Sequence, residues 1–126
     1  MIETISFPES FRTRFTNGRH EILADAPIDK GGGGAGPGAH ELLEAALAVC
    51  MNMAVRMSAA EHGIPLKSVS TRVKLNRPTP ETINFEYAVD FIGPLSDDQR
   101  SQLEHAARTC PVRQTLLKRI EFTEVD

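Results

Sequence analysis

A chain of 126 residues, 40% hydrophobic and 25% charged, has the size and composition of a globular domain, and we interpret residues 1–126 as a single domain. The net charge of −3 and the scattered lysines and arginines argue against nucleic-acid binding, which usually requires a basic patch. The N-terminal sequence lacks the basic start, apolar core and cleavage site of a signal peptide, so a cytoplasmic location is expected. Two cysteines in that reducing compartment do not make a disulfide framework.

The N-terminal part of the chain predicts strands followed by a loop. Residues 3–25 are expected to form an extended hairpin around the turn signal Asn17-Gly18. The glycine-rich segment 30–38 excludes a helix or a central strand. It lacks the Lys-Ser/Thr of a phosphate-binding loop, so we interpret it as a flexible loop. This loop is either a lid or a connector that crosses between the two chains of a dimer.

The longest apolar pattern, from residue 39 to residue 62, predicts a helix. Its apolar residues recur every three or four positions, so the helix should be buried on most sides. The narrow polar stripe that remains consists of His40, Glu44, Asn52 and Arg56. These polar residues argue against a membrane span. Gly63 and Pro65 are expected to end the helix.

The second half of the chain predicts a hairpin, two helices and a last strand. Alternation of apolar and polar residues predicts strands over 68–76 and 82–92. Ser96 is expected to cap one helix, and Pro111 to begin another that runs to Arg119. Residues 120–125 have the pattern of a short strand. The fold class is therefore α+β, with an antiparallel sheet and helices gathered on one side.

The two cysteines are the candidate chemical groups. Cys50 lies in the middle of the long helix, either as a small buried hydrophobe or as a reactive thiolate that requires a nearby cation. Cys110 precedes a helix start, where free N–H groups favour a thiolate, or else it fills core space. The four histidines share no ligand spacing and there is no CxxC motif, so neither a metal nor a cofactor is expected.

Two segments that contain these cysteines resemble signatures of a known family. Residues 36–50, GPGAHELLEAALAVC, are similar to the GPxPxELLLAALGAC signature of OsmC/Ohr proteins. Residues 110–116, CPVRQTL, are similar to the CPVHxTL motif of the same family. The ADAP segment before the glycine-rich loop and the segment 63–66 also fit. The resemblance covers roughly the whole chain.

The resemblance implies a fold, an activity and partners. The implied fold is OsmC-like, with antiparallel sheets packed on a long central helix and two chains intertwined as a homodimer. The implied activity is a thiol-dependent peroxidase that reduces organic hydroperoxides in oxidative-stress defence, with no nucleic-acid or membrane partner. By position, Cys50 matches the cysteine that attacks the peroxide and becomes a sulfenic acid, and Cys110 matches the one that converts it to a disulfide. A dithiol reductant, often a lipoylated protein, then reduces that disulfide.

The charged residues of the family pattern match less closely. Family peroxidases carry an arginine in the N-terminal strands, and alternation makes Arg14 and Arg12 the candidates here, with Arg14 slightly favoured. The family glutamate that lies ten residues before the first cysteine is His40 in this chain. Ten helical residues span about 15 Å, so His40 cannot touch Cys50 of its own helix. Glu41 is expected to have a structural role near the helix N-terminus.

Other interpretations stay open at this stage. Arg113 replaces the histidine of the second motif, either as a cation near Cys110 or as an exposed helix residue. The chain is alternatively an OsmC-family protein without peroxidase activity, which binds a small apolar ligand at the dimer interface. In a third interpretation both cysteines only fill core space.

Overall fold

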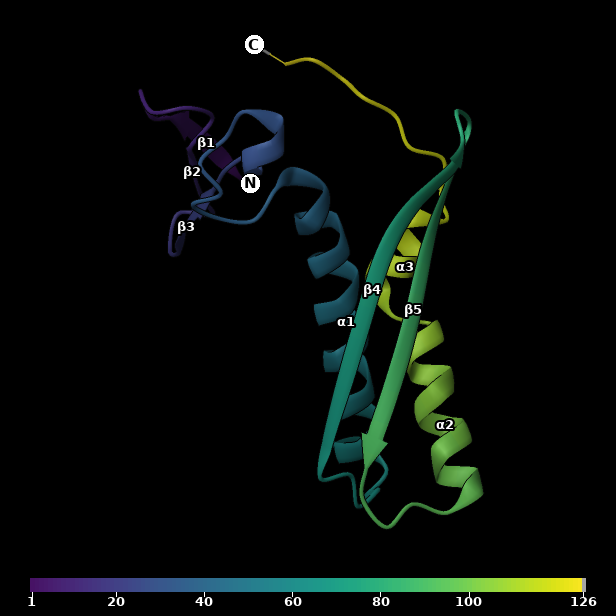
Figure 1. Cartoon of the computed structure of the whole chain (residues 1–126). Helices are drawn as coiled ribbons and strands as arrows, with labels where there is room; N and C mark the ends of the chain where they lie inside the picture. The colour runs from purple at the N-terminus through teal and green to yellow at the C-terminus, as the bar shows by residue number, and fades with distance from the viewer. Residues whose placement is uncertain (126) are drawn as a thin grey trace. The chain divides into compact units, whose positions relative to one another are not determined.

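The structure is a computed structural model that describes residues 1–125 (Figure 1). The chain divides into two compact units, residues 1–43 and residues 44–126, and the boundary falls inside one helix. Each unit has its own secondary structure and its own packing. The single domain over residues 1–126 stays a prediction.

The N-terminal unit is built on a three-stranded antiparallel sheet. Its strands are β1 (Glu3–Ser6), β2 (Thr13–Thr16) and β3 (Glu21–Ala24), in the order β1-β2-β3. The turn between β2 and β3 forms at Asn17-Gly18, where Gly18 adopts a φ of 92° that a residue without Cβ tolerates. The hairpin predicted there is confirmed, and β1 adds a third strand beside it.

A buried carboxylate holds the glycine-rich segment that follows. Asp25 is only 5% exposed. Its two oxygens accept hydrogen bonds of 2.8 to 3.2 Å from the backbone N–H groups of Ala26, Gly33 and Ala35. A Cβ on Gly32 or Gly36 would collide with backbone atoms at the end of β3 and just after it. After the short 3-10 helix η1 (Ile28–Lys30), the segment therefore follows a defined path set by Asp25.

The predicted long helix is α1 (Ala39–Glu61), which begins in the N-terminal unit and continues in the C-terminal unit. The N–H of Gly38 donates to Oε1 of Glu41 at 3.1 Å, which confirms the structural role predicted for Glu41. The prediction of burial on most sides is wrong within the single chain, because Val49, Met53 and Met57 are 49%, 49% and 67% exposed. By length and composition α1 is apolar enough to cross a membrane, which is weak support for a span because helices of soluble cores pass the same test.

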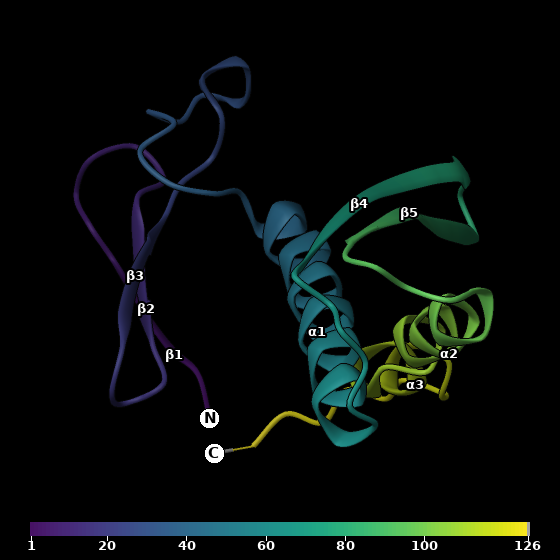
Figure 2. The same cartoon turned by 90° about the horizontal axis from the view of Figure 1, so that it is seen from below.

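The C-terminal unit packs helices against one face of a long hairpin. Strands β4 (Ser68–Thr79) and β5 (Thr82–Ile92) pair antiparallel, and α2 (Asp97–Arg108) and α3 (Pro111–Leu116) follow. Helices α1 and α2 lie on the same side of the hairpin (Figure 2). The buried core between them consists of Leu47, Met51, Val55, Ala59, Ile64, Leu103, Ala107 and Cys110. Ser96 caps α2 in a capping box with Gln99, as predicted.

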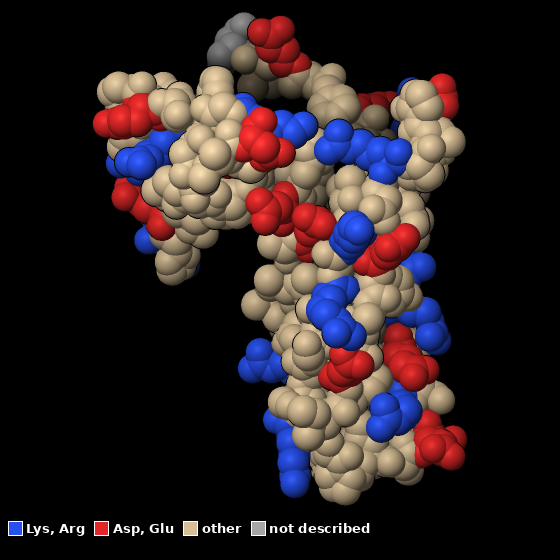
Figure 3. Space-filling model, viewed as in Figure 1, with Lys and Arg blue, Asp and Glu red and all other residues tan. Residues whose placement is uncertain are grey.

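Hydrogen bonds from two residues of the polar stripe, Glu44 and Asn52, and from the Ala48 carbonyl attach α1 to β4. The N–H of Leu75 donates to Oε2 of Glu44 at 2.9 Å. The hydroxyl of Thr71 donates to the carbonyl of Ala48 at 2.8 Å. The side-chain amide of Asn52 donates to the carbonyl of Val69 at 3.0 Å. Two of these bonds satisfy backbone groups that β5 leaves unpaired. The opposite face of the hairpin carries basic and acidic side chains interspersed, as the visible face in Figure 3 shows.

The C-terminal end differs from the prediction. Helix α3 ends at Leu116 and not at Arg119. The strand predicted over 120–125 is wrong, since these residues form no strand. A strand requires a hydrogen-bonded neighbour, and no strand within residues 1–125 pairs with this segment. Its apolar side chains remain exposed, with Phe122 at 95%.

Candidate thiol site

Cys50 and Cys110 come together in the C-terminal unit, where α1 meets the start of α3. Cys110 is 1% exposed, whereas Cys50 is half-buried, and both are free thiols. Cys50 is close enough to Cys110 to help raise the pKa of the Cys110 thiol. The backbone N–H of Val112 also donates to Sγ of Cys50, at 3.3 Å. The two sulfur atoms are therefore neighbours, and one of them has a backbone donor.

Local sequence explains why a backbone N–H is free at this position. Cys110 is the N-cap of α3 in an extended conformation, with φ −61° and ψ 149°, and Pro111 is the first helical residue. Proline has no N–H, and its fixed φ suits the first position of a helix. Val112 is thus the first residue of α3 with an N–H group, and that N–H has no acceptor within its own helix. Cys50, on the facing helix, supplies the acceptor.

The environment makes the two thiols unequal. Burial raises the pKa of the Cys110 thiol above its ordinary value. The backbone N–H of Arg113 opposes that rise in pKa, and Cys50 adds to it through its hydrogen bond and its charge. Cys110 therefore stays protonated at neutral pH. Cys50 is the more exposed of the two residues, and its sulfur accepts the Val112 hydrogen bond.

The predicted arginines lie in the N-terminal unit. Nη1 of Arg14 pairs with Oε1 of Glu21 on the neighbouring strand, at 3.3 Å. Arg12 immediately precedes β2, and its Nε is buried without a hydrogen-bond partner. Because these arginines and the cysteines belong to different units, their role toward Cys50 stays a prediction.

Arg113 contacts a residue of β5 that the sequence did not connect with the second cysteine motif. Nη1 of Arg113 donates to the hydroxyl of Tyr87 at 3.1 Å, and the guanidinium lies 5.6 Å from the centre of the Tyr87 ring. Arg113 is thus half-buried against β5 and is not a fully exposed helix residue, whereas its role as a cation near Cys110 stays a prediction. Alternation placed Tyr87 on the same strand face as Phe85, but nothing in the sequence linked it to the second cysteine motif. Within residues 1–125, no group of three or more His, Cys, Asp or Glu is arranged to hold a metal ion.

Comparisons with known proteins agree with this fold. A family model described as OsmC-like protein matches residues 31–125. A solved structure of a protein assigned to the osmotic stress and detoxification response of Psychrobacter arcticus has 24% sequence identity and a TM-score of 0.76, with 90% of this chain and 85% of that chain covered. No curated protein matches the sequence.

Two further solved structures with this fold differ in the function that their names give. An organic hydroperoxide resistance protein OsmC from Legionella pneumophila has 21% identity and a TM-score of 0.67, covering 93% of this chain and 88% of that chain. An OsmC-like protein of unknown function from Vibrio cholerae has 16% identity and a TM-score of 0.69, covering 91% of each chain. At these identities the likeness shows the fold alone. The family model spans both cysteine motifs and most of the sequence, and the chain therefore belongs to the OsmC/Ohr family.

Proposed function

We propose that this protein is a thiol-dependent peroxidase that reduces organic hydroperoxides through Cys50 and Cys110, as part of oxidative-stress defence. The observation that carries the proposal is that the two thiols are neighbours, with the backbone N–H of Val112 donating to Sγ of Cys50. Solved structures with the same fold include proteins named for organic hydroperoxide resistance, from Legionella pneumophila and Bacillus subtilis.

In the first step of the proposed reaction, the Cys50 thiolate attacks one oxygen of the hydroperoxide. The O–O bond breaks, Cys50 becomes a sulfenic acid, and the alkoxide leaves and takes up a proton to give the alcohol. The backbone N–H of Val112 donates to Sγ of Cys50, which fixes the position of this sulfur at the start of α3. Cys50 is partly exposed to solvent, whereas Cys110 is buried, which supports Cys50 as the cysteine that meets the peroxide.

In the second step Cys110 attacks the sulfenic sulfur, the S–S bond forms, and water leaves. The charge of Cys50 contributes to the raised pKa of Cys110, and a sulfenic acid is neutral. Cys110 therefore becomes easier to ionise once Cys50 has reacted, which is when its thiolate is needed. A dithiol then reduces the disulfide, which restores both thiols.

Arg12 and Arg14 are the proposed cations that hold the thiolate and orient the peroxide. Of the two, Arg12 has the buried and unpartnered Nε, whereas Arg14 already pairs with Glu21. We therefore expect Arg12→Gln to reduce kcat/KM for a hydroperoxide more strongly than Arg14→Gln. Equal rates for both variants and the wild type would remove these arginines from the proposal.

A homodimer in the cytoplasm is a further part of the proposal. Val49, Met53 and Met57 form an exposed apolar stripe one turn apart on α1, and a second copy of the chain would cover it. A reducing compartment supplies the dithiol that the cycle requires. Light scattering should give twice the chain mass for the wild type and a lower mass for Met53→Glu. A monomeric wild type would contradict the dimer.

Chemical trapping of the sulfenic acid tests the assignment of the two thiols. Reduced Cys110→Ser protein, treated with cumene hydroperoxide and dimedone, is expected to gain one dimedone adduct, located on Cys50 by peptide mass spectrometry. The matched variant Cys50→Ser should gain none. An adduct on Cys110 alone would reverse the roles, and no adduct in either variant would refute the proposed chemistry.

A further inference from the structure

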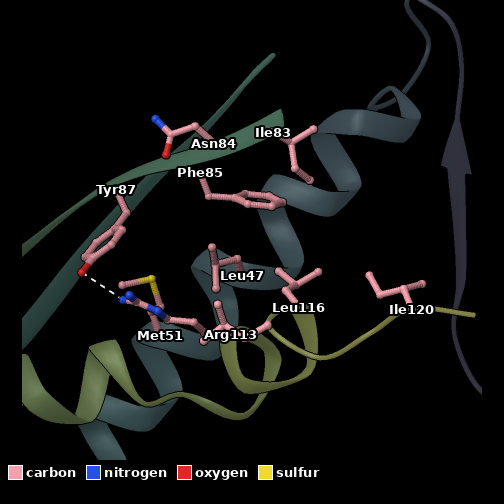
Figure 4. A pocket seen from close by; sticks show the side chains of 10 residues that line it. Leu47, Met51, Ile83, Asn84, Phe85, Tyr87, Arg113, Leu116 and Ile120 are labelled. Atoms are coloured by element: carbon pink, nitrogen blue, oxygen red, sulfur yellow. Dashed lines mark hydrogen bonds between the residues drawn. The ribbon is translucent and has the colours of Figure 1, made fainter. Parts of the chain in front are cut away.

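The C-terminal unit contains an apolar cavity of about 290 Å³ that the proposed thiol chemistry does not use. It lies between α1, β5 and α3 (Figure 4). Its apolar walls come from Leu47, Met51, Ile83, Phe85, Leu116 and Leu117. Neither cysteine is among the residues that line it. The volume is at the lower end of the range for small-molecule sites.

The sequence pattern explains why the cavity forms here. Ile83, Phe85 and Tyr87 alternate along β5 and therefore share the face that looks toward the helices. Leu47 and Met51 are one turn apart on the buried face of α1. Helix α3 is only six residues long and ends at Leu116, so it covers this part of the hairpin incompletely.

One charged group lines this cavity, and it is Arg113. Figure 4 shows its guanidinium beside Tyr87, at the opposite end from Ile83. The Tyr87 hydroxyl accepts one hydrogen bond from it, and no carboxylate within residues 1–125 pairs with it. A guanidinium has five N–H groups, so donors remain for a ligand.

We propose that this cavity binds a small amphipathic monocarboxylate, with its apolar body against the walls and its carboxylate on Arg113. Arginine presents two parallel N–H groups that match a carboxylate, and the interaction is strong where water is partly excluded. A single cation with no second basic group in the lining matches a monoanion better than a phosphate dianion. The ligand occupies this site without reacting, and the site does not depend on Cys50.

Binding of octanoate to the full-length reduced protein tests this proposal, with 1-octanol as the uncharged probe. Calorimetry should show saturable binding of octanoate to the wild type. Arg113→Gln should weaken octanoate binding by about tenfold, equivalent to about 1.4 kcal/mol, and leave octanol binding nearly unchanged. Arg100→Gln is the matched control, because Arg100 lies 5.7 Å from the ring centre of Phe91, also on β5, outside the cavity lining.

Two more variants separate this site from the thiol site. Ile83→Trp should fill the cavity and abolish binding of both probes, and its circular dichroism and melting temperature report whether it folds. Cys50→Ser should bind octanoate as the wild type does, even if peroxidase activity is absent from both. Octanoate binding that is absent from the wild type, or equal in wild type and Arg113→Gln, would overturn the proposal.

Discussion

The backbone N–H of Val112 donates to Sγ of Cys50 at 3.3 Å, across 62 positions of sequence. This contact ties the start of α3 to the middle of α1. It exists because Pro111 supplies no N–H at the first helical position, which makes Val112 the first donor of α3. Cys110 precedes Pro111 in the same short segment. The start of α3 therefore places both a hydrogen-bond donor and a second thiol beside Cys50.

The raised pKa of Cys110 predicts a loss of stability in alkali. The folded state keeps the Cys110 proton at pH values where the unfolded chain releases it, so the stabilisation is complete below the ordinary thiol pKa and is lost as the pH rises above it. Urea unfolding of reduced protein at pH 7.5 and pH 9.5 should show a fall in the free energy of unfolding. The fall should be smaller in Cys110→Ala. An identical pH dependence in both proteins would mean that Cys110 is not linked to folding.

The hydrogen bond from Thr71 to Ala48 should contribute measurably to the attachment of β4 to α1. Thr71→Val keeps the shape of the side chain and removes the hydroxyl donor, so we expect a loss of about 1 kcal/mol in the free energy of unfolding. Thr79→Val, at the exposed end of the same strand, is the matched control and should change the stability by less than about 0.5 kcal/mol. Equal effects would mean that the Thr71 hydroxyl contributes nothing specific.

Leu103 packs α2 into the core, so its substitution by alanine should reduce the stability strongly. It is completely buried, so Leu103→Ala is expected to cost about 2–5 kcal/mol through lost burial and the cavity that remains. Leu117 is 71% exposed, and Leu117→Ala should cost much less. Chemical denaturation of both variants gives the comparison. A small effect at Leu103 would contradict the packing described for α2.

Asp25 should determine the order of the glycine-rich segment. Asp25→Ala removes the acceptor for the N–H groups of Gly33 and Ala35, so their hydrogen exchange should become faster. Amides of β5 in the C-terminal unit should exchange as before. Asp29→Ala changes an exposed acidic residue of η1, just before this segment, and as the control it should leave exchange at Gly33 and Ala35 unchanged.

Features that depend on neighbouring residues were predictable from the sequence. The turn at Asn17-Gly18, the cap at Ser96 and the long α1 all follow from local backbone preferences and short-range periodicity. The family resemblance predicted the fold class, which the structure confirms.

Features that depend on distant segments were not predictable in this way. Periodicity identified the apolar positions of α1 but not which of them the chain itself covers, so the exposure of Met57 was unexpected. The alternating segment 120–125 had the pattern of a strand, but no strand among the described residues pairs with it. The Val112 donor and the contact of Arg113 with Tyr87 join residues far apart in sequence, and only the folded hairpin and helices bring them together.

The most direct test of the proposed peroxidase mixes the reduced wild type with one equivalent of cumene hydroperoxide in the absence of oxygen. We expect the loss of two free thiols per chain, a mass decrease of about two hydrogen atoms as the Cys50–Cys110 disulfide forms, and one equivalent of the alcohol. A subsequent dithiol should restore both thiols. Retention of both thiols, with the hydroperoxide unconsumed, would contradict the proposed peroxidase activity.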